Sequence, residues 1–162
     1  MKKILLLLLV AFAAPNLQAQ ESELDWHTDI SEAVSLSSKT QKPMMLFFTG
    51  SDWCGWCKKL EREVFFTPEF TKWAKDNVIL VELDFPRSKP QSVELKQQNA
   101  QLNAFFKVRG YPTIWFVNGN ENGEGKIAFE ALGSTGYVAG GPEKWLAGAN
   151  SIINKDKSTG SK

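Results

Sequence analysis

The feature that most constrains the fold is a short apolar segment, Met44–Thr49, which is followed closely by two cysteines. Its letters read MMLFFT, with no alternation between apolar and polar residues. Such a run is typical of a strand that is buried on both faces, as in a sheet covered by helices. Residues 50–52 (Gly-Ser-Asp) then predict a turn, and a helix is expected from about Cys54 to Val64. The chain therefore predicts an α/β fold with both cysteines at the start of a helix.

Helices and strands alternate through the rest of the sequence. Asp29 or Ser31 can cap a first helix that ends near Lys39, and Thr67 and Pro68 begin another. Strands separated by helices favour parallel pairing, and a closing hairpin favours an antiparallel edge. The sequence thus predicts one domain, residues 20–153, with a central mixed sheet of four to five strands and helices on both faces. The further expected elements are strands over 78–85, 113–117 and 126–132, a hairpin turn over 118–125, and helices over 92–108 and 141–153.

Composition and charge exclude several classes of protein. The chain has 162 residues, of which 43% are hydrophobic and 12% aromatic, and this excludes a mainly disordered protein. Nineteen basic and eighteen acidic residues give a net charge of +1, so there is no basic excess to bind nucleic acid. Two cysteines are too few for a disulfide-rich small domain or for a four-thiolate zinc site within one chain.

The first 19 residues predict a secretory signal peptide. A basic start precedes an apolar run over Ile4–Ala14, and residues 17–19 (Leu-Gln-Ala) place a small residue before a plausible cleavage point. The run is shorter than the ~20 residues that a spanning helix needs, so an uncleaved membrane anchor is the weaker alternative. We therefore expect a periplasmic or secreted protein in an oxidising compartment. Residues 154–162 are expected to form a flexible polar tail.

The strongest chemical signal is the motif Cys54-Gly55-Trp56-Cys57 at the expected helix start. Cysteines three residues apart lie on one face of a helix, and this spacing suits a disulfide. Free N–H groups and the helix dipole lower the pKa of the first thiol. We expect Cys54 to be the more exposed nucleophile and Cys57 to resolve the mixed disulfide. A structural disulfide, two inert thiols and a metal site remain alternatives, although a metal site needs two more ligands and His27 is the sole histidine.

Together with a second motif, Gly110–Thr113 (GYPT), these residues resemble the thioredoxin superfamily. The resemblance runs from about Trp26 to Ile152. It implies a thioredoxin fold whose redox group is the Cys54–Cys57 disulfide, with no bound cofactor. Within the superfamily, the chain looks like exported bacterial proteins similar to the C-terminal thioredoxin-like domain of the membrane thiol-reductant transporter. The matching segments are Lys42-Pro43 before the first strand, Trp53–Lys58 (WCGWCK), Asp84, Gly110–Thr113 (GYPT) and the closing helix.

The resemblance also implies which residues contact a substrate. In the family, the proline of the second motif is cis and lies against the disulfide, so Pro112 is expected to be cis and the Tyr111 backbone to pair with an extended substrate. Trp56 is expected to be exposed and to form an apolar surface with Tyr111. Core packing is the favoured role of Trp53. The expected substrate-binding residues are Trp53, Gly55, Trp56, Tyr111 and Pro112.

The buried acid that assists the resolving thiol in thioredoxins is missing here. It lies six residues before the first cysteine, where this chain has Phe48. Glu61, four residues after Cys57, is the candidate substitute, and the related transporter domain resembles this chain in having an acid there. We expect Glu61 to raise the pKa of the Cys57 thiol and to accept its proton. The alternative is a surface glutamate paired with Lys58; Glu82 alternates along a strand, and the sequence does not place it.

These observations predict an exported thiol–disulfide oxidoreductase that reduces or exchanges protein disulfides. No histidine lies between the cysteines to stabilise a thiolate, which favours a reductase. One alternative is a thiol oxidant or disulfide isomerase, although the sequence offers no dimerisation arm. Another is a non-catalytic binding module, which would not need both cysteines. The expected partners are protein disulfides or dithiols and, as electron donor, a membrane thiol-reductant transporter; we expect a monomer.

Overall fold

A computed structural model describes residues 24–121 and 127–154. The predicted signal peptide over 1–19, the tip of the predicted hairpin turn and all but the first residue of the predicted polar tail lie outside the described residues. Within the described part, no helix is long and apolar enough to cross a membrane.

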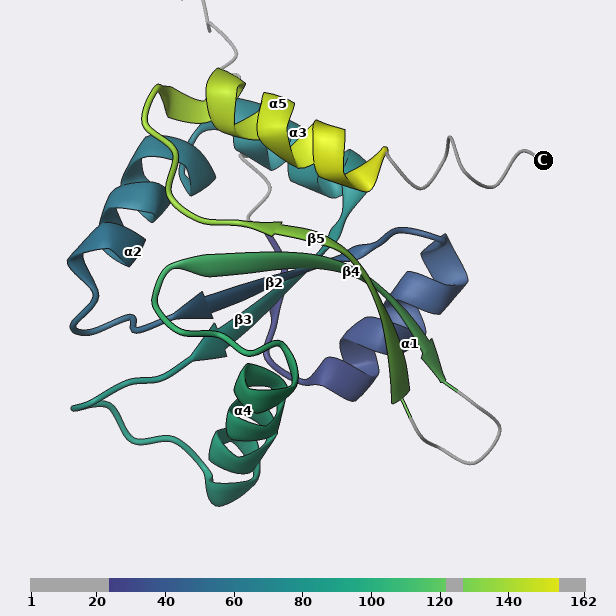
Figure 1. Cartoon of the computed structure of the whole chain (residues 1–162), viewed down its shortest axis with the longest axis vertical. Helices are drawn as coiled ribbons and strands as arrows, with labels where there is room; N and C mark the ends of the chain where they lie inside the picture. The colour runs from purple at the N-terminus through teal and green to yellow at the C-terminus, as the bar shows by residue number, and fades with distance from the viewer. Residues whose placement is uncertain (1–23, 122–126, 155–162) are drawn as a thin grey trace, which may run out of the picture.

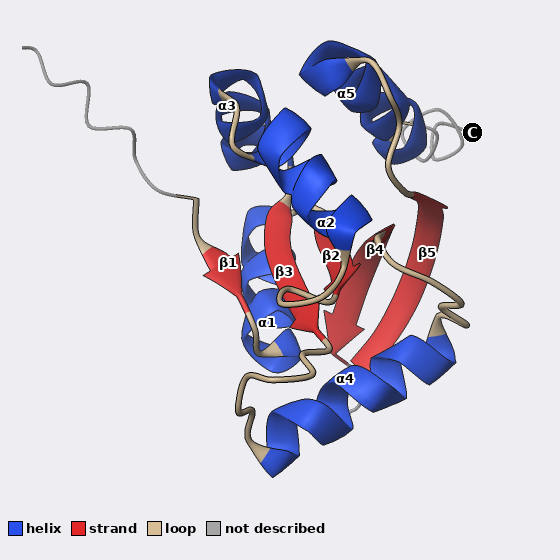
Figure 2. Cartoon of the chain, turned by 90° about the vertical axis from the view of Figure 1, so that its left-hand side faces the viewer, coloured by secondary structure: helices blue, strands red, loops and turns tan. Residues whose placement is uncertain are grey.

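A five-stranded mixed sheet forms the centre of the domain, with strand order β1-β3-β2-β4-β5. The first three strands in this order run parallel, and β4 and β5 continue the sheet as an antiparallel pair. Helices cover both faces: Figure 1 shows α3 and α5 above the sheet and α1 and α4 below it, and Figure 2 shows the same layers from the side. The strands are β1 (Trp26–His27), β2 (Met44–Thr49), β3 (Ile79–Asp84), β4 (Thr113–Glu121) and β5 (Ile127–Thr135).

The apolar run of β2 is explained by its central place in the sheet. All six of its residues are buried, and alternate side chains enter the two opposite cores. Met45 and Phe47 pack in the core that contains both cysteines, whereas Met44, Leu46 and Phe48 pack in the other. The expected mixed sheet covered on both faces is therefore present.

Three of the helices begin directly after a residue whose side chain caps them. Asp29 caps α1, because its carboxylate accepts the backbone N–H groups of Ser31 at 2.8 Å and Glu32 at 3.0 Å. Thr67 caps α3, with a proline in the first turn as expected, and Ser92 caps α4. The helices are α1 (Ile30–Thr40), α2 (Gly55–Leu60), the π-helix η1 (Glu61–Phe65), α3 (Pro68–Asn77), α4 (Val93–Phe105) and α5 (Gly141–Ile153).

Several predicted boundaries were wrong. The expected helix from Cys54 to Val64 divides at Glu61, where the Phe66 N–H reaches back five residues to the Glu61 carbonyl at 2.8 Å. The expected turn over 118–125 starts too early, because residues 118–121 pair with β5 and the ladder outweighs their turn preference. The helix predicted over 92–108 ends at Phe105, since Lys107 has a left-handed φ of 51°. The two-residue strand β1, which pairs with β3, had not been predicted.

Candidate active site

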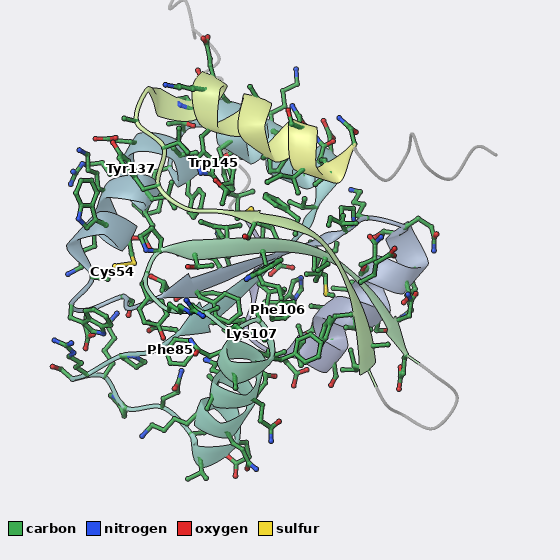
Figure 3. All side chains as sticks on the ribbon, in the orientation of Figure 1. Cys54, Phe85, Phe106, Lys107, Tyr137 and Trp145 are labelled. Carbon is green, nitrogen blue, oxygen red and sulfur yellow. A yellow bond between two sulfur atoms is a disulfide. The ribbon has the colours of Figure 1, made fainter. Side chains whose placement is uncertain are left out.

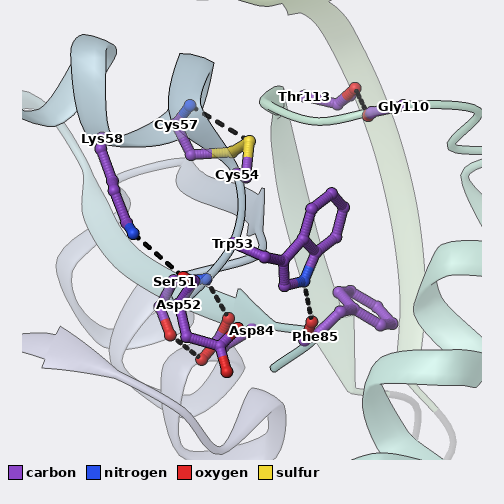
Figure 4. Close-up of a disulfide and its surroundings, with 10 residues drawn as sticks. All are labelled: Ser51, Asp52, Trp53, Cys54, Cys57, Lys58, Asp84, Phe85, Gly110 and Thr113. Atoms are coloured by element: carbon purple, nitrogen blue, oxygen red, sulfur yellow. Dashed lines mark hydrogen bonds between the residues drawn. A yellow bond between two sulfur atoms is a disulfide. The ribbon is translucent and has the colours of Figure 1, made fainter. Parts of the chain in front are cut away.

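The two cysteines form a disulfide at the start of α2, with their Cα atoms 5.3 Å apart. Cys54 is the N-cap residue, and its sulfur accepts the Cys57 backbone N–H at 3.1 Å (Figure 4). Cys54 is 5% exposed and Cys57 is 0% exposed, so the first sulfur is the more accessible one, as expected, although both are buried. Within residues 24–121 and 127–154, no group of three or more metal-binding side chains lies together.

The turn before the disulfide is held in place by its own backbone and by a glycine. The N–H groups of Trp53 and Cys54 both donate to the Gly50 carbonyl, at 3.1 Å and 2.8 Å. A Cβ atom at Gly50 would collide with the Trp53 indole, so a side chain is excluded there. This close approach fixes where α2 begins and therefore where the disulfide lies.

Two aspartates tie this turn to the end of β3 and to the loop that follows it. The Asp84 carboxylate accepts the Ser51 backbone N–H at 2.8 Å and the Ser51 hydroxyl at 2.6 Å (Figure 4). The Asp52 carboxylate accepts the backbone N–H groups of Arg87 at 3.1 Å and Ser88 at 2.6 Å, and these bonds lower the pKa of Asp52. Both aspartates thus act as backbone anchors for the active-site turn.

Trp53 and Tyr111 form the first of two aromatic pairs beside the disulfide. The Trp53 indole N–H donates to the Phe85 carbonyl at 2.8 Å, and the Tyr111 ring meets the Trp53 ring edge-on at a centroid distance of 5.7 Å. The Arg87 guanidinium lies 4.1 Å from the centre of the Trp53 ring. Burial raises the pKa of Tyr111, whose hydroxyl accepts from Asn103 at 3.0 Å. Trp53 is half-buried and fixed from several sides.

Trp56 belongs to the second aromatic pair, and its partner is Tyr137. The Tyr111 ring packs on Trp53 and Phe85, and the expected apolar surface shared by Trp56 and Tyr111 stays a prediction. The Trp56 and Tyr137 ring centroids are 5.2 Å apart. As expected, Trp56 is exposed, with 58% of its surface accessible. Figure 3 shows Tyr137 and Phe85 on opposite sides of Cys54 in that view, so the two aromatic pairs flank the disulfide.

The segment that contains Pro112 lies before β4. The Tyr111–Pro112 peptide bond is cis, and the Thr113 hydroxyl donates to the Gly110 carbonyl at 2.7 Å. A Cβ atom added at Gly136 would lie 3.2 Å from the Pro112 carbonyl oxygen, so the chain after β5 passes close to this proline. Three segments distant in sequence therefore meet in this part of the molecule: the start of α2, the Pro112 segment and the chain after β5.

The position on β2 that faces the cysteines is Phe47, not Phe48. Phe47 packs in the core that contains Cys57, and Phe48 points to the opposite face of the sheet. Counting six residues back from Cys54 therefore selects the wrong face of the strand. The buried acid of thioredoxins is still missing from this chain, because both Phe47 and Phe48 are phenylalanines.

Two half-buried glutamates lie on the cysteine side of the sheet. Glu82 is beside Phe47 in the ladder, and Leu80, two residues before it, packs with the cysteines, so Glu82 lies on the face of the sheet that carries the cysteines. Burial raises the pKa of Glu61, and repulsion from the carboxylates of Glu82 and Asp84 adds to the rise. Burial likewise raises the pKa of Glu82, with a smaller contribution from Asp84.

Lys58 is not paired with Glu61, as the alternative interpretation of the sequence had it. Its ammonium group donates to the Asp52 backbone carbonyl at 3.0 Å, and it lowers the pKa of Glu61 only as a lesser, opposing effect. Glu61 is therefore a partly desolvated carboxyl group near two other acids, and a raised pKa is typical of carboxyl groups that exchange protons at active sites.

Sequence reasoning missed Tyr137, Arg87 and the placement of Glu82. Tyr137 and Arg87 reach the site from loops, and no local pattern marks a loop residue that contacts a distant helix. Glu82 could have been placed from the alternation along β3, since the apolar residues on either side of it belong to the opposite face.

Comparison with known proteins agrees with this geometry. A family model described as thioredoxin-like matches residues 25–119. The chain is 36% identical over 118 residues to the disulfide bond reductase DsbH of Chlamydia pneumoniae, covering 73% of this chain and 70% of that protein. A solved structure of a DsbH oxidoreductase is similar with a TM-score of 0.71 and 34% identity, covering 82% of this chain and 86% of that one. These likenesses confirm the thioredoxin fold.

A second curated relative is much longer than this chain. The chain is 31% identical over 123 residues to the thiol:disulfide interchange protein DsbD of Klebsiella pneumoniae subsp. pneumoniae. The match covers 72% of this chain but 19% of DsbD, so the likeness concerns one part of that protein.

Proposed function

The chain belongs to the thioredoxin-like family and is a thiol–disulfide oxidoreductase, and we propose that it acts as an exported reductase of protein disulfides. The observation that carries this proposal is the Cys54–Cys57 disulfide at the start of α2, with half-buried acids on the same side of the sheet as Cys57. A similar protein that covers most of this chain is a disulfide bond reductase by name.

The charges around the cysteines favour the reducing direction. Glu61 and Glu82 face this side of the sheet, and negative charge near a thiol disfavours its thiolate form. No cationic side chain lies between the cysteines to offset them, because residues 55 and 56 are glycine and tryptophan. Stabilising the thiolate is what makes a disulfide strongly oxidising. Here the helix start stabilises the Cys54 sulfur without help from a cationic side chain between the cysteines, so the reduced protein gives up its electrons more readily than a strong oxidant does.

The reaction transfers two electrons from the dithiol to the substrate. The Cys54 thiolate attacks one sulfur of the substrate disulfide, forming a mixed disulfide and releasing the first substrate thiolate. Cys57 then loses its proton, and its thiolate attacks the Cys54 sulfur. This step breaks the mixed disulfide, releases the second substrate thiolate and leaves the Cys54–Cys57 disulfide. Substrate is reduced by two electrons and the protein is oxidised by two.

Substrate binding rests on residues beside the reacting sulfurs. The backbone of Tyr111 before Pro112 pairs with an extended substrate segment, which aligns the substrate disulfide with Cys54. Gly55 leaves space above the helix start, since a Cβ atom there would meet nothing within 4 Å. Trp53 shapes the surface on one side of the disulfide, and Trp56 does so on the other. No bound cofactor takes part, because the disulfide itself carries the electrons.

Glu61 accepts the proton of the Cys57 thiol in this proposal. Burial and two nearby acids raise the pKa of Glu61, which brings it closer to that of a thiol and makes proton transfer between them easier. We expect Glu61→Gln to change the dependence of the disulfide-exchange rate on pH, with the exposed Glu69→Gln as the control. An unchanged profile in Glu61→Gln would remove this residue from the mechanism.

The proposal also covers the export of the protein and the re-reduction of its Cys54–Cys57 disulfide. An N-terminal signal peptide over residues 1–19 would deliver the chain to the periplasm or the medium. In an oxidising compartment, a reductase needs electrons from within the cell, and a membrane thiol-reductant transporter of the DsbD type suits that task. We propose that the protein acts as a monomer.

The proposal is tested by reduction of insulin with a dithiol such as dithiothreitol as the electron donor. We expect the protein to accelerate insulin reduction above the rate with donor alone. Cys54→Ser should abolish this acceleration, and Cys57→Ser should trap the mixed disulfide with substrate. Phe105→Ala, which removes an exposed ring from α4, is the matched control and should behave as the parent does. A parent protein that adds nothing to the donor rate would point to a binding module instead.

A further inference from the structure

Trp56 is an exposed side chain beside the reactive disulfide, and its value for substrate binding depends on how firmly its indole ring is oriented. Trp56 lies between the two cysteines in sequence, and 58% of its surface is accessible. A free side chain of this size loses rotational freedom when a substrate covers it, and that loss weakens binding. A substrate surface built on Trp56 is therefore stronger if the indole is already held in one orientation.

Two groups touch the Trp56 ring, and three further contacts hold those two groups in place. The Tyr137 ring packs against it at 5.2 Å, and the Lys59 ammonium group lies 5.1 Å from the Trp56 ring centre and 5.0 Å from that of Tyr137. The Tyr137 hydroxyl donates to a Glu63 carboxylate oxygen at 2.6 Å, and Lys59 lies 3.9 Å from the other oxygen of the same group. Trp56, Tyr137, Lys59 and Glu63 thus form a closed set, which we call the Trp56 cluster.

Tyr137 is the member that links this cluster to the rest of the site. The other three residues belong to α2 and η1, whereas Tyr137 follows β5 in sequence. Its neighbour Gly136 lies against the Pro112 carbonyl, so Tyr137 connects the Pro112 segment to the exposed face of α2. Figure 3 shows Tyr137 and Phe85 on opposite sides of Cys54 in that view, and the Tyr137 ring packs against Trp56.

We propose that Tyr137 determines specificity for protein substrates by positioning Trp56 beside the disulfide. This inference rests on the proposed function and adds the residue that selects polypeptide over small disulfides. A polypeptide that presents its disulfide to Cys54 extends over the neighbouring surface and contacts the Trp56 ring, while a small disulfide is too short to do so. Tyr137 does not touch the reacting sulfurs, so it is a positioning residue and not a catalytic one.

The test compares two substrates on the same variants. For Tyr137→Ala, we expect the ratio of kcat/KM for insulin to kcat/KM for hydroxyethyl disulfide to fall about tenfold. The reason is that the free energy contributed by one aromatic pair is about the size that corresponds to a tenfold change in kcat/KM. The loss should appear mainly as a higher KM for insulin. Tyr137→Phe keeps the ring but removes the hydrogen bond to Glu63, and we expect a fall of about threefold.

One control variant and the activity of the parent protein keep the inference separate from the proposed function. Phe66→Ala removes another exposed ring, 76% accessible and outside the Trp56 cluster, and should leave the ratio at the parent value. If the parent protein reduces insulin but both Tyr137 variants keep the parent ratio, the role of Tyr137 is wrong and the proposed function stands. If Tyr137→Ala fails to fold, Tyr137→Phe and Lys59→Met decide the question, and parent ratios in both would overturn the inference. A parent protein that does not reduce insulin at all overturns the proposed function itself.

Discussion

The two tryptophans on either side of the disulfide are held by different means. Trp53 is half-buried, hydrogen-bonded through its indole N–H to the Phe85 carbonyl and packed against Gly50. Among the contacts described, Trp56 makes no hydrogen bond of this kind, and its ring is contacted by the half-buried Tyr137 ring and the Lys59 ammonium group. The difference teaches that one tryptophan builds the active-site turn, whereas the other is held with its ring exposed to a substrate.

Truncating each tryptophan should separate these roles through stability, and the largest effect is expected for Trp53. Trp53→Ala removes a half-buried ring, its hydrogen bond and its contact with Tyr111, and should lower the free energy of unfolding by about 3 kcal/mol. Trp56→Ala should lower it by about 1 kcal/mol or less, because its ring is mostly exposed. Urea unfolding of the oxidised proteins measures both values. Equal losses would show that the two tryptophans are not divided as described.

Trp56, which should matter little for stability, should show its effect when activity is measured. Trp56→Ala should reduce kcat/KM for insulin by about 30-fold, as expected when a central contact residue of an interface is truncated. The variant should keep the reduction potential of the parent, since the charge near the cysteines is unchanged. A stable Trp56→Ala protein with the parent rate would contradict the assignment of Trp56 to substrate binding.

A smaller effect should come from the acids that lie on the cysteine side of the sheet. Because burial raises the pKa of Glu82 in the folded state, folded protein holds this proton more tightly than unfolded protein does. Stability should therefore fall as pH rises above the ordinary glutamate pKa of 4.5, and the loss is complete once pH exceeds the raised pKa. Glu82→Gln should show a smaller fall in melting temperature over this range. A fall equal to that of the parent would mean that Glu82 is not desolvated.

Much of this architecture could be predicted from the sequence because its signals are local. The buried run of β2, the capping residues of α1 and α3 and the spacing of the two cysteines each depend on neighbouring residues alone. The π-helix at Glu61 escaped prediction because five-residue hydrogen bonds leave no pattern distinct from an ordinary helix. Strand β1 escaped because two residues are too short for a periodic signal.

The parts of the site that were missed depend on contacts between distant residues. Tyr137 and Glu63 are 74 positions apart, and their hydrogen bond exists only once the sheet brings β5 beside the Pro112 segment. Which phenylalanine of β2 faces the cysteines depends on the pleat of the strand relative to the turn, so counting from Cys54 chose Phe48 where the structure has Phe47. Motifs locate the reacting sulfurs, but the surroundings of those sulfurs require the fold.

The most direct test of the reductase account is the reduction potential of the Cys54–Cys57 pair. Equilibration in defined dithiol and disulfide buffers, followed by tryptophan fluorescence, gives the potential of the folded protein. The account predicts a reduction potential of about −270 mV, the reducing end of the range for this kind of protein. A reduction potential of about −120 mV would mark the protein as an oxidant and contradict the proposed direction of electron flow.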